Sequence, residues 1–167
     1  RGGQPGFSRP VLVALSASAS AATYGGGVRQ LDQADAELWS VDHSPLGNRF
    51  AVGGDDRVIR VYTNRGDFQF GLPPVAVRVR NVRFSPDGLL LGVTMLQTTP
   101  QDDSGAVDDR AVLLFDLAAR QEKCRLGGHI REVTGLSFSL DGRLVASASE
   151  DGSIRLWNVS DCAANGS

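Results

Sequence analysis

The feature that most constrains this chain is a segment near its C-terminus, where closely spaced turn signals leave room only for short strands. Residues 126–160 read LGGHIREVTGLSFSLDGRLVASASEDGSIRLWNVS. Turn dipeptides divide the segment at Gly127-Gly128, Asp141-Gly142 and Asp151-Gly152. The spacing predicts strands at 133–138, 144–149 and 153–159. The third alternates apolar and polar residues, as Ile154-Arg155-Leu156 shows, which is typical of a half-buried antiparallel strand.

Four polar or aromatic residues of this segment can form one hydrogen-bonded relay. They are His129 before the first strand, Ser147 in the second, Asp151 in the following turn and Trp157 in the third. An indole N–H can donate to a serine hydroxyl, the hydroxyl can donate to an imidazole, and the other imidazole nitrogen can donate to a carboxylate. We interpret the relay as structural, although Ser147, His129 and Asp151 are also the residue types of a hydrolase triad.

The order of these signals identifies a family resemblance. Gly-His, then Ser-x-Asp-Gly, then Ser-x-x-x-Asp, then Ile-Arg-Leu-Trp-Asn resembles a WD repeat, which forms one four-stranded blade of a β-propeller. Asn158 stands where the family usually has Asp. The resemblance implies an all-β fold in which the relay locks the strands of one blade together.

A first copy of the repeat is recognised at residues 34–73. Gly47 and Asp56 lie nine residues apart, as do Gly142 and Asp151, and Asp56 and Tyr62 lie six apart, as do Asp151 and Trp157. Ala34 and Val52 occupy the positions of His129 and Ser147, so no relay is expected here, and His43 is interpreted as a structural strand residue. Packing of this blade is assigned to six residues: Val41, Phe50, Val52, Val58, Val61 and Tyr62.

A second copy occupies residues 74–125 and carries an insertion. Ser85-Pro86-Asp87-Gly88 repeats the turn signal, and Asp109 and Phe115 are again six residues apart. The insertion at 97–107, QTTPQDDSGAV, has the composition of a loop. It is either a tolerated surface excursion or an acidic contact loop that uses Asp102 and Asp103 together with Asp108. It lacks the Asp-x-Asp-x-Asp-Gly pattern of a calcium loop.

These copies predict an all-β chain, a partial β-propeller of about three well-formed four-stranded blades at 34–73, 74–125 and 126–162. Residues 10–33 are a degenerate N-terminal blade, or residues 10–15 are a strand that closes the ring. Fourth strands are expected at 68–72 and 123–126, whereas the tail at 163–167 is a poor strand former. The chain starts with Arg1. Because three blades are too few to close a ring, we expect it to be the C-terminal part of a larger propeller protein.

Composition excludes several functions. The formal net charge is -2 and the pI is near 5.6, with no basic run, so direct binding of nucleic acid is not expected. No segment is long and apolar enough to predict membrane insertion. Cys124 and Cys162 are too few for a disulfide framework and are interpreted as incidental thiols in a reducing compartment, which predicts an intracellular location in the cytoplasm or nucleus.

The sequence offers no catalytic, metal-binding or phosphate-binding constellation, so we predict a chain that is not an enzyme and needs no cofactor. Its predicted role is a noncatalytic scaffold that binds other proteins in a multiprotein assembly and also the rest of its own propeller. The alternatives are a substrate-recognition subunit of a ubiquitin ligase and a propeller domain appended to an enzyme. Trp39 is either a partner contact or a strand core residue. The predicted partner contacts are Trp39, Arg78, Arg80, Arg131, Glu132, Asp102 and Asp103.

Overall fold

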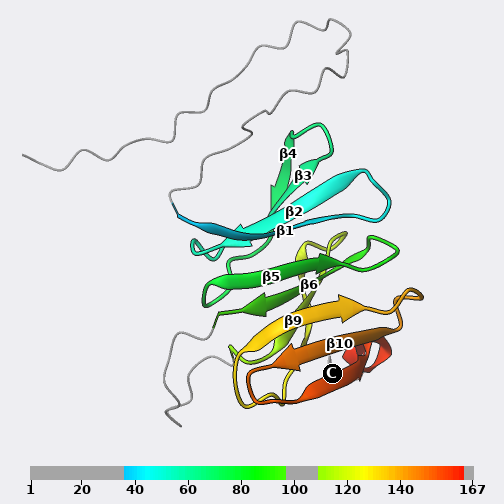
Figure 1. Cartoon of the computed structure of the whole chain (residues 1–167). Helices are drawn as coiled ribbons and strands as arrows, with labels where there is room; N and C mark the ends of the chain where they lie inside the picture. The colour runs from blue at the N-terminus through cyan, green and yellow to red at the C-terminus, as the bar shows by residue number, and fades with distance from the viewer. Residues whose placement is uncertain (1–35, 97–108, 164–167) are drawn as a thin grey trace, which may run out of the picture. The chain divides into compact units, whose positions relative to one another are not determined.

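The computed structural model describes residues 36–96 and 109–163, which form three antiparallel sheets (Figure 1). The first sheet contains β1 (Leu38–His43), β2 (Arg49–Gly54), β3 (Arg60–Thr63) and β4 (Phe68–Gly71) in that order. The second contains β5 (Val79–Phe84), β6 (Leu90–Met95), β7 (Val112–Asp116) and β8 (Gln121–Leu126). The third contains β9 (Val133–Phe138), β10 (Leu144–Ser149) and β11 (Ile154–Asn158), and the 3-10 helix η1 (Val159–Ala163) follows it.

The prediction of an all-β chain built from blade-like meanders is confirmed. The fourth strands expected near 68–72 and 123–126 are present as β4 and β8. The third sheet has three strands rather than four in the described part of the chain, because the residues after β11 turn into η1. The proposed N-terminal blade or closing strand (10–33), the insertion (97–107) and residues 164–167 lie outside the described residues.

The serine and glycine turns explain why the first two strands of each sheet form hairpins. In the third sheet the Ser139 N–H donates to the Leu144 carbonyl at 2.9 Å, and the Gly142 N–H donates to the Ser139 carbonyl at 2.9 Å. Gly142 has a φ of 70°, a conformation that glycine adopts without steric cost. The Ser139 hydroxyl donates to Asp141 at 2.6 Å, and this bond is the main reason why the pKa of Asp141 is lowered.

Two apolar cores join the sheets. The larger core lies between the first and second sheets, where Ile59 and Val61 pack with Val82, Leu91 and Phe115. The smaller core lies between the second and third sheets and is made of buried residues with partly buried residues at its margin. Its buried members are Val112, Leu114, Cys124, Leu126, Val133, Leu136, Val145 and Cys162.

Polar contacts reinforce the first of these junctions along the neighbouring strands β1 and β5. The backbone N–H of Val82 donates to the Ser40 hydroxyl at 3.1 Å. The backbone N–H of Phe84 donates to the Asp42 carboxylate at 2.8 Å. The side chains of β1 therefore satisfy backbone donors of β5 that face out of the second sheet.

The outer faces of the first and third sheets are uncovered in the described part of the chain. Val41 is 58% exposed, whereas Val82 and Leu136, at the same position of the other two sheets, are 0% and 8% exposed. The prediction that Val41 is a packing residue is therefore wrong for the described structure, because no described sheet covers it.

Among the described residues, no helix is long and apolar enough to cross a membrane.

The outer face of the third sheet, at the other end of the array, also exposes apolar side chains. Ile154 and Leu156 are 81% and 66% exposed. The residues at their positions in the second sheet, Val112 and Leu114, are fully buried against the third sheet. The two ends of this array of sheets thus expose apolar residues, whereas the equivalent residues at the junctions between sheets are buried.

Candidate functional site

The structure brings the four relay residues together between the strands of the third sheet. The His129 ring lies with Nε2 2.8 Å from the Ser147 hydroxyl and with Nδ1 2.9 Å from an Asp151 carboxylate oxygen. The Trp157 indole N–H donates to the same Ser147 hydroxyl at 2.9 Å. Because that hydroxyl accepts from Trp157, its own proton is available to His129 Nε2, and the Nδ1–H tautomer of His129 can then donate to Asp151.

Asp151 collects further donors that the sequence analysis did not include. Its carboxylate accepts from the backbone N–H groups of Ile130 and Ser153, at 3.1 and 2.8 Å, and from the Ser153 hydroxyl at 2.5 Å. The bond from the Ser153 hydroxyl is the largest cause that lowers the pKa of Asp151 well below its usual range. Burial is the second-largest cause and opposes it, and the bond from His129 and the backbone bonds lower the pKa further. The Asp-Gly-Ser order was the signal for Ser153, since a hydroxyl two residues after an aspartate can return to its carboxylate.

This geometry is that of a lock between strands. The side chain of His129 is fully buried, and Ser147 is 2% exposed, so a substrate has no path to the hydroxyl. The Ser147 hydroxyl already accepts from the Trp157 indole N–H and gives its own proton to His129 Nε2. Residues 36–96 and 109–163 contain no group of three His, Cys, Asp or Glu side chains arranged to hold a metal ion.

A second arrangement involves the first strand of each sheet, where β1, β5 and β9 follow one another in space (Figure 1). Each of these strands has a β-bulge at the same place, and the extra residue is Trp39 in β1, Arg80 in β5 and Thr134 in β9. A bulge leaves its extra residue out of the pairing and turns its side chain away from the regular pleat. The bulge at Thr134 could not be recognised from the sequence, because a bulge is visible only once the pairing register is known.

Trp39, Arg80 and Glu132 form a continuous contact row across the three sheets. The Arg80 guanidinium lies 5.7 Å from the centre of the Trp39 ring, and its Nε lies 3.4 Å from the Glu132 carboxylate. Trp39 is 44% exposed and the Arg80 side chain 37% exposed, but Glu132 is only 8% exposed. Glu132 therefore orients Arg80 from below, and Trp39 with Arg80 form the accessible part of the row.

The other predicted partner contacts are not part of this row. Arg78 is exposed and pairs with Asp55 at 3.5 Å across the first and second sheets. Arg131 is exposed, and its backbone carbonyl accepts from Ser149 at 3.1 Å. Asp102 and Asp103 lie outside the described residues.

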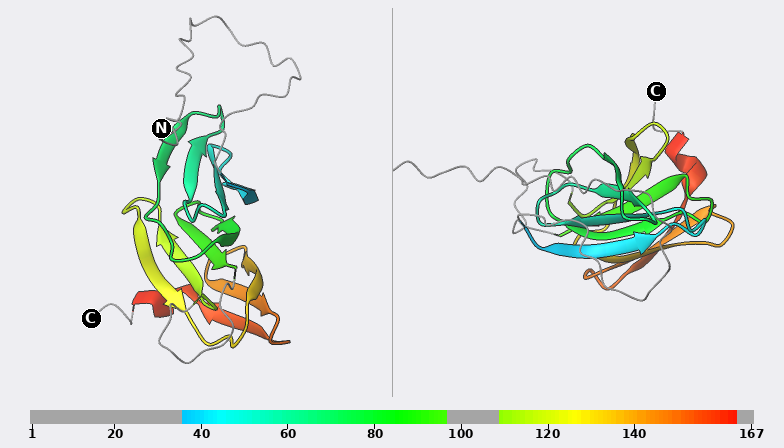
Figure 2. Two further views of the ribbon diagram at one scale, coloured as in Figure 1. Left: turned by 90° about the vertical axis from the view of Figure 1, so that its left-hand side faces the viewer. Right: turned by 90° about the horizontal axis from the view of Figure 1, so that it is seen from above.

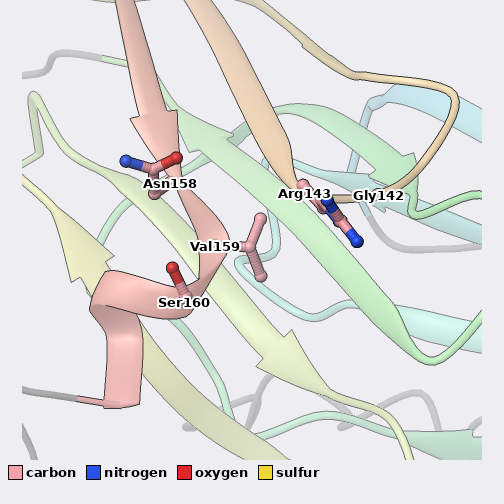
Figure 3. A pocket seen from close by; sticks show the side chains of 5 residues that line it. All are labelled: Gly142, Arg143, Asn158, Val159 and Ser160. Carbon is pink, nitrogen blue, oxygen red and sulfur yellow. The ribbon is translucent and has the colours of Figure 1, made fainter.

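A shallow pocket of about 370 Å³ lies between the turn that joins β9 to β10 and the end of β11 (Figure 3). Figure 3 shows Gly142 and Arg143 on one side, and Asn158, Val159 and Ser160, from the end of β11 and the start of η1, on the other. Arg143 is the one ionisable side chain among its five lining residues, and none of the five is a carboxylate or an imidazole that could act as a general acid or base.

The prediction that Cys124 and Cys162 are separate thiols is wrong. The structure joins them in a disulfide, with their Cα atoms 5.4 Å apart. Cys124 lies in β8 of the second sheet and Cys162 in η1 after the third, as Figure 2 shows for the red helix and the yellow strand beside it. The sequence could not show this pairing, because a separation of 38 residues is closed only when the two sheets pack together.

Comparison with known families agrees with the repeat pattern. The family model described as WD domain, G-beta repeat, matches residues 27–63 and 120–158. The chain belongs to the WD-repeat family. The two matches leave out β5, β6 and β7 of the second sheet and include its fourth strand, β8, although that sheet has the same four-strand order as the first.

Several known proteins resemble the chain along part of their length. It is 30% identical to the probable cytosolic iron-sulfur protein assembly protein 1 of Candida glabrata, over 75% of the chain and 38% of that protein. It is 36% identical to pre-mRNA-processing factor 19 homolog 2 of Arabidopsis thaliana, over 46% of the chain and 12% of that protein. It is 30% identical to cell division cycle protein cdt2 of Schizosaccharomyces pombe, over 75% of the chain and 26% of that protein. The chain therefore spans well under half of the length of these relatives.

Proposed function

We propose that this chain is a noncatalytic scaffold section of a larger WD-repeat propeller and that it binds other proteins within an intracellular assembly. The observation that carries the proposal is the contact row of Trp39, Arg80 and Glu132. An exposed tryptophan beside an arginine whose position is fixed by a buried carboxylate combines two of the three side chains that are enriched at binding hot spots. Because Glu132 holds Arg80, little side-chain entropy would be lost when a partner binds.

The uncovered outer faces support the view that this chain is one section of a longer ring. Positions that are buried at the two junctions between sheets are exposed at both ends of the array, as Val41 and Leu156 illustrate. A neighbouring blade at each end would bury these residues as Val82 and Leu114 are buried. The names of the relatives, which refer to a cytosolic assembly protein and a pre-mRNA-processing factor, support an assembly partner and a location in the cytoplasm or nucleus.

Affinity purification with quantitative mass spectrometry tests the proposal. The chain is expressed with its natural flanking sequence, and proteins that copurify in fixed stoichiometry are compared among wild type, Trp39→Ala and Leu140→Ala. Leu140 is 94% exposed in the Ser139 turn and serves as the matched control, because it is apolar and lies outside the contact row.

The proposal predicts that Trp39→Ala loses at least one stoichiometric partner and that Leu140→Ala loses none. Recovery of a ubiquitin ligase as that partner would favour the substrate-recognition alternative. An unchanged set of partners with Trp39→Ala would refute the contact row as the binding site.

A further inference from the structure

The disulfide occupies a defined position at the junction between the second and third sheets. Cys124 is in the outermost strand β8, and Cys162 is in the turn that follows β11. They are 9% and 4% exposed, and both belong to the apolar core of this junction. The bond therefore ties the last described turn of the third sheet to the outer strand of the second.

The junction between the first and second sheets has a noncovalent contact at the same place. Phe70 pairs with Val61 in the first sheet just as Cys124 pairs with Leu114 in the second, and both pairings lie beside a register shift. Arg120 lies four residues after Asp116, as Cys162 lies four residues after Asn158, the last residue of β11. The Arg120 guanidinium lies 4.6 Å from the centre of the Phe70 ring.

The two contacts are thus equivalent links between the outer strand of one sheet and a turn of the next. In one junction the link is a cation–π contact, which is formed and lost without any chemical change. In the other it is a covalent bond that exists in only one oxidation state. The covalent link falls at the junction with the smaller apolar core and the sheet with fewer described strands.

We propose that Cys124 and Cys162 form a redox-controlled clasp that sets how firmly the third sheet is held against the second. In the oxidised state the bond closes a loop that contains β9, β10 and β11, which restricts the opening of this sheet. In the reduced state η1 is held only by noncovalent contacts, and the third sheet separates more often from the core residues Leu114 and Leu126. The inference does not depend on the contact row or on the identity of a partner.

The exchange reaction needs a dithiol reductant. One thiolate of the reductant attacks a sulfur of the disulfide, the S–S bond breaks, and a mixed disulfide forms. The first attack releases one cysteine as a thiol and leaves the other bound to the reductant. The second thiol of the reductant then attacks this mixed disulfide and displaces the second cysteine, so the reductant loses two electrons and two protons and Cys124 and Cys162 gain them. A disulfide such as oxidised glutathione drives the reverse reaction. Because both sulfurs are buried, we expect exchange to require transient opening of η1.

The test measures amide hydrogen exchange of the full chain after equilibration in dithiothreitol or in oxidised glutathione, with alkylation and mass measurement to count thiols. The clasp predicts one intramolecular disulfide in oxidised glutathione and two thiols after reduction. Reduction is expected to accelerate exchange in β9, β10 and β11 by about 100-fold, with a smaller change in β1 to β4. Cys162→Ser is expected to behave like the reduced wild type in both buffers.

Arg120→Ala is the matched control, because it removes the equivalent link of the other junction and leaves both cysteines. It should retain the redox response of the third sheet. Two results would overturn the proposal: thiols that remain unpaired in oxidised glutathione, or a disulfide whose reduction leaves exchange in β9 to β11 unchanged.

Discussion

At three equivalent positions, the third sheet has hydrogen-bonded polar and aromatic side chains, and the second sheet has only apolar ones. In the third sheet, His129, Ser147 and Trp157 are joined by hydrogen bonds. The equivalent positions of the second sheet are occupied by Val75, Val93 and Phe115, which are 7%, 0% and 2% exposed. Val75 lies three residues after Leu72 as His129 does after Leu126, and Phe115 and Trp157 both lie six residues after an aspartate.

The comparison shows that the blade geometry does not require the relay. An apolar cluster loses stability in proportion to the atoms that are removed from it, and its neighbours can partly relax. A buried polar network behaves differently, because removal of one member leaves the others without partners in a low-dielectric interior. The third sheet is therefore expected to be more sensitive to small polar changes and the second sheet to changes in volume.

The largest expected effect is that of Phe115→Ala in the second sheet. Phe115 is 2% exposed in the larger core, so its truncation leaves a cavity that the surrounding valines cannot fill. We expect the free energy of unfolding to fall by about 3–5 kcal/mol, measured by urea denaturation. A loss below about 1 kcal/mol would show that this position is not closely packed. It would contradict the expectation that the second sheet is sensitive to changes in side-chain volume.

A smaller effect is expected for Asp151→Ala, which deprives His129, Ser153 and the Ile130 N–H of an acceptor. Asp56→Ala in the first sheet is the matched substitution. Asp56 pairs with Arg60 at 2.6 Å and accepts from the Val58 N–H, but Val52 stands at the position that Ser147 has in the third sheet. We expect a fall in Tm of about 5 °C for Asp151→Ala and a smaller fall for Asp56→Ala. Equal shifts would contradict a special role of the relay.

The smallest expected effect is a dependence of stability on acidity. The hydrogen bond from Ser153 is the main reason why the pKa of Asp151 is lowered in the folded chain. The stabilisation of the folded chain by ionised Asp151 is therefore complete above the ordinary aspartate pKa of about 4. It is lost as the pH falls toward the lowered pKa that Asp151 has in the folded chain. Urea denaturation between neutral and acidic pH should show the stability advantage of wild type over Asp151→Asn shrinking below about pH 4. An advantage that stays constant into this acidic range would exclude a lowered pKa.

The strands and the members of the relay could be predicted from the sequence, because both depend on local spacing. The Ser-x-Asp-Gly turns determine where each hairpin reverses. Asp151 lies in the turn before β11, and Trp157 lies within that strand, six residues later. The hydrogen bonds among His129, Ser147 and Trp157 follow from donors and acceptors placed on adjacent strands.

Features that depend on the packing of one sheet on another could not be predicted. The pairing of Cys124 with Cys162 requires the third sheet to dock on the second. The contact between Trp39 and Arg80 requires two bulges at matching positions on neighbouring strands. The exposure of Val41 depends on what covers the first sheet, which the pattern of a single repeat does not determine.

The most direct test of the relay as a unit is a double-mutant cycle of His129→Ala and Trp157→Phe. The two side chains share no hydrogen bond, and both bond to the Ser147 hydroxyl. Urea denaturation of the four proteins is expected to show a coupling of about 1 kcal/mol between the two substitutions. Additivity within about 0.3 kcal/mol would contradict the account, because it would mean that the third sheet is held by independent contacts rather than by one connected network.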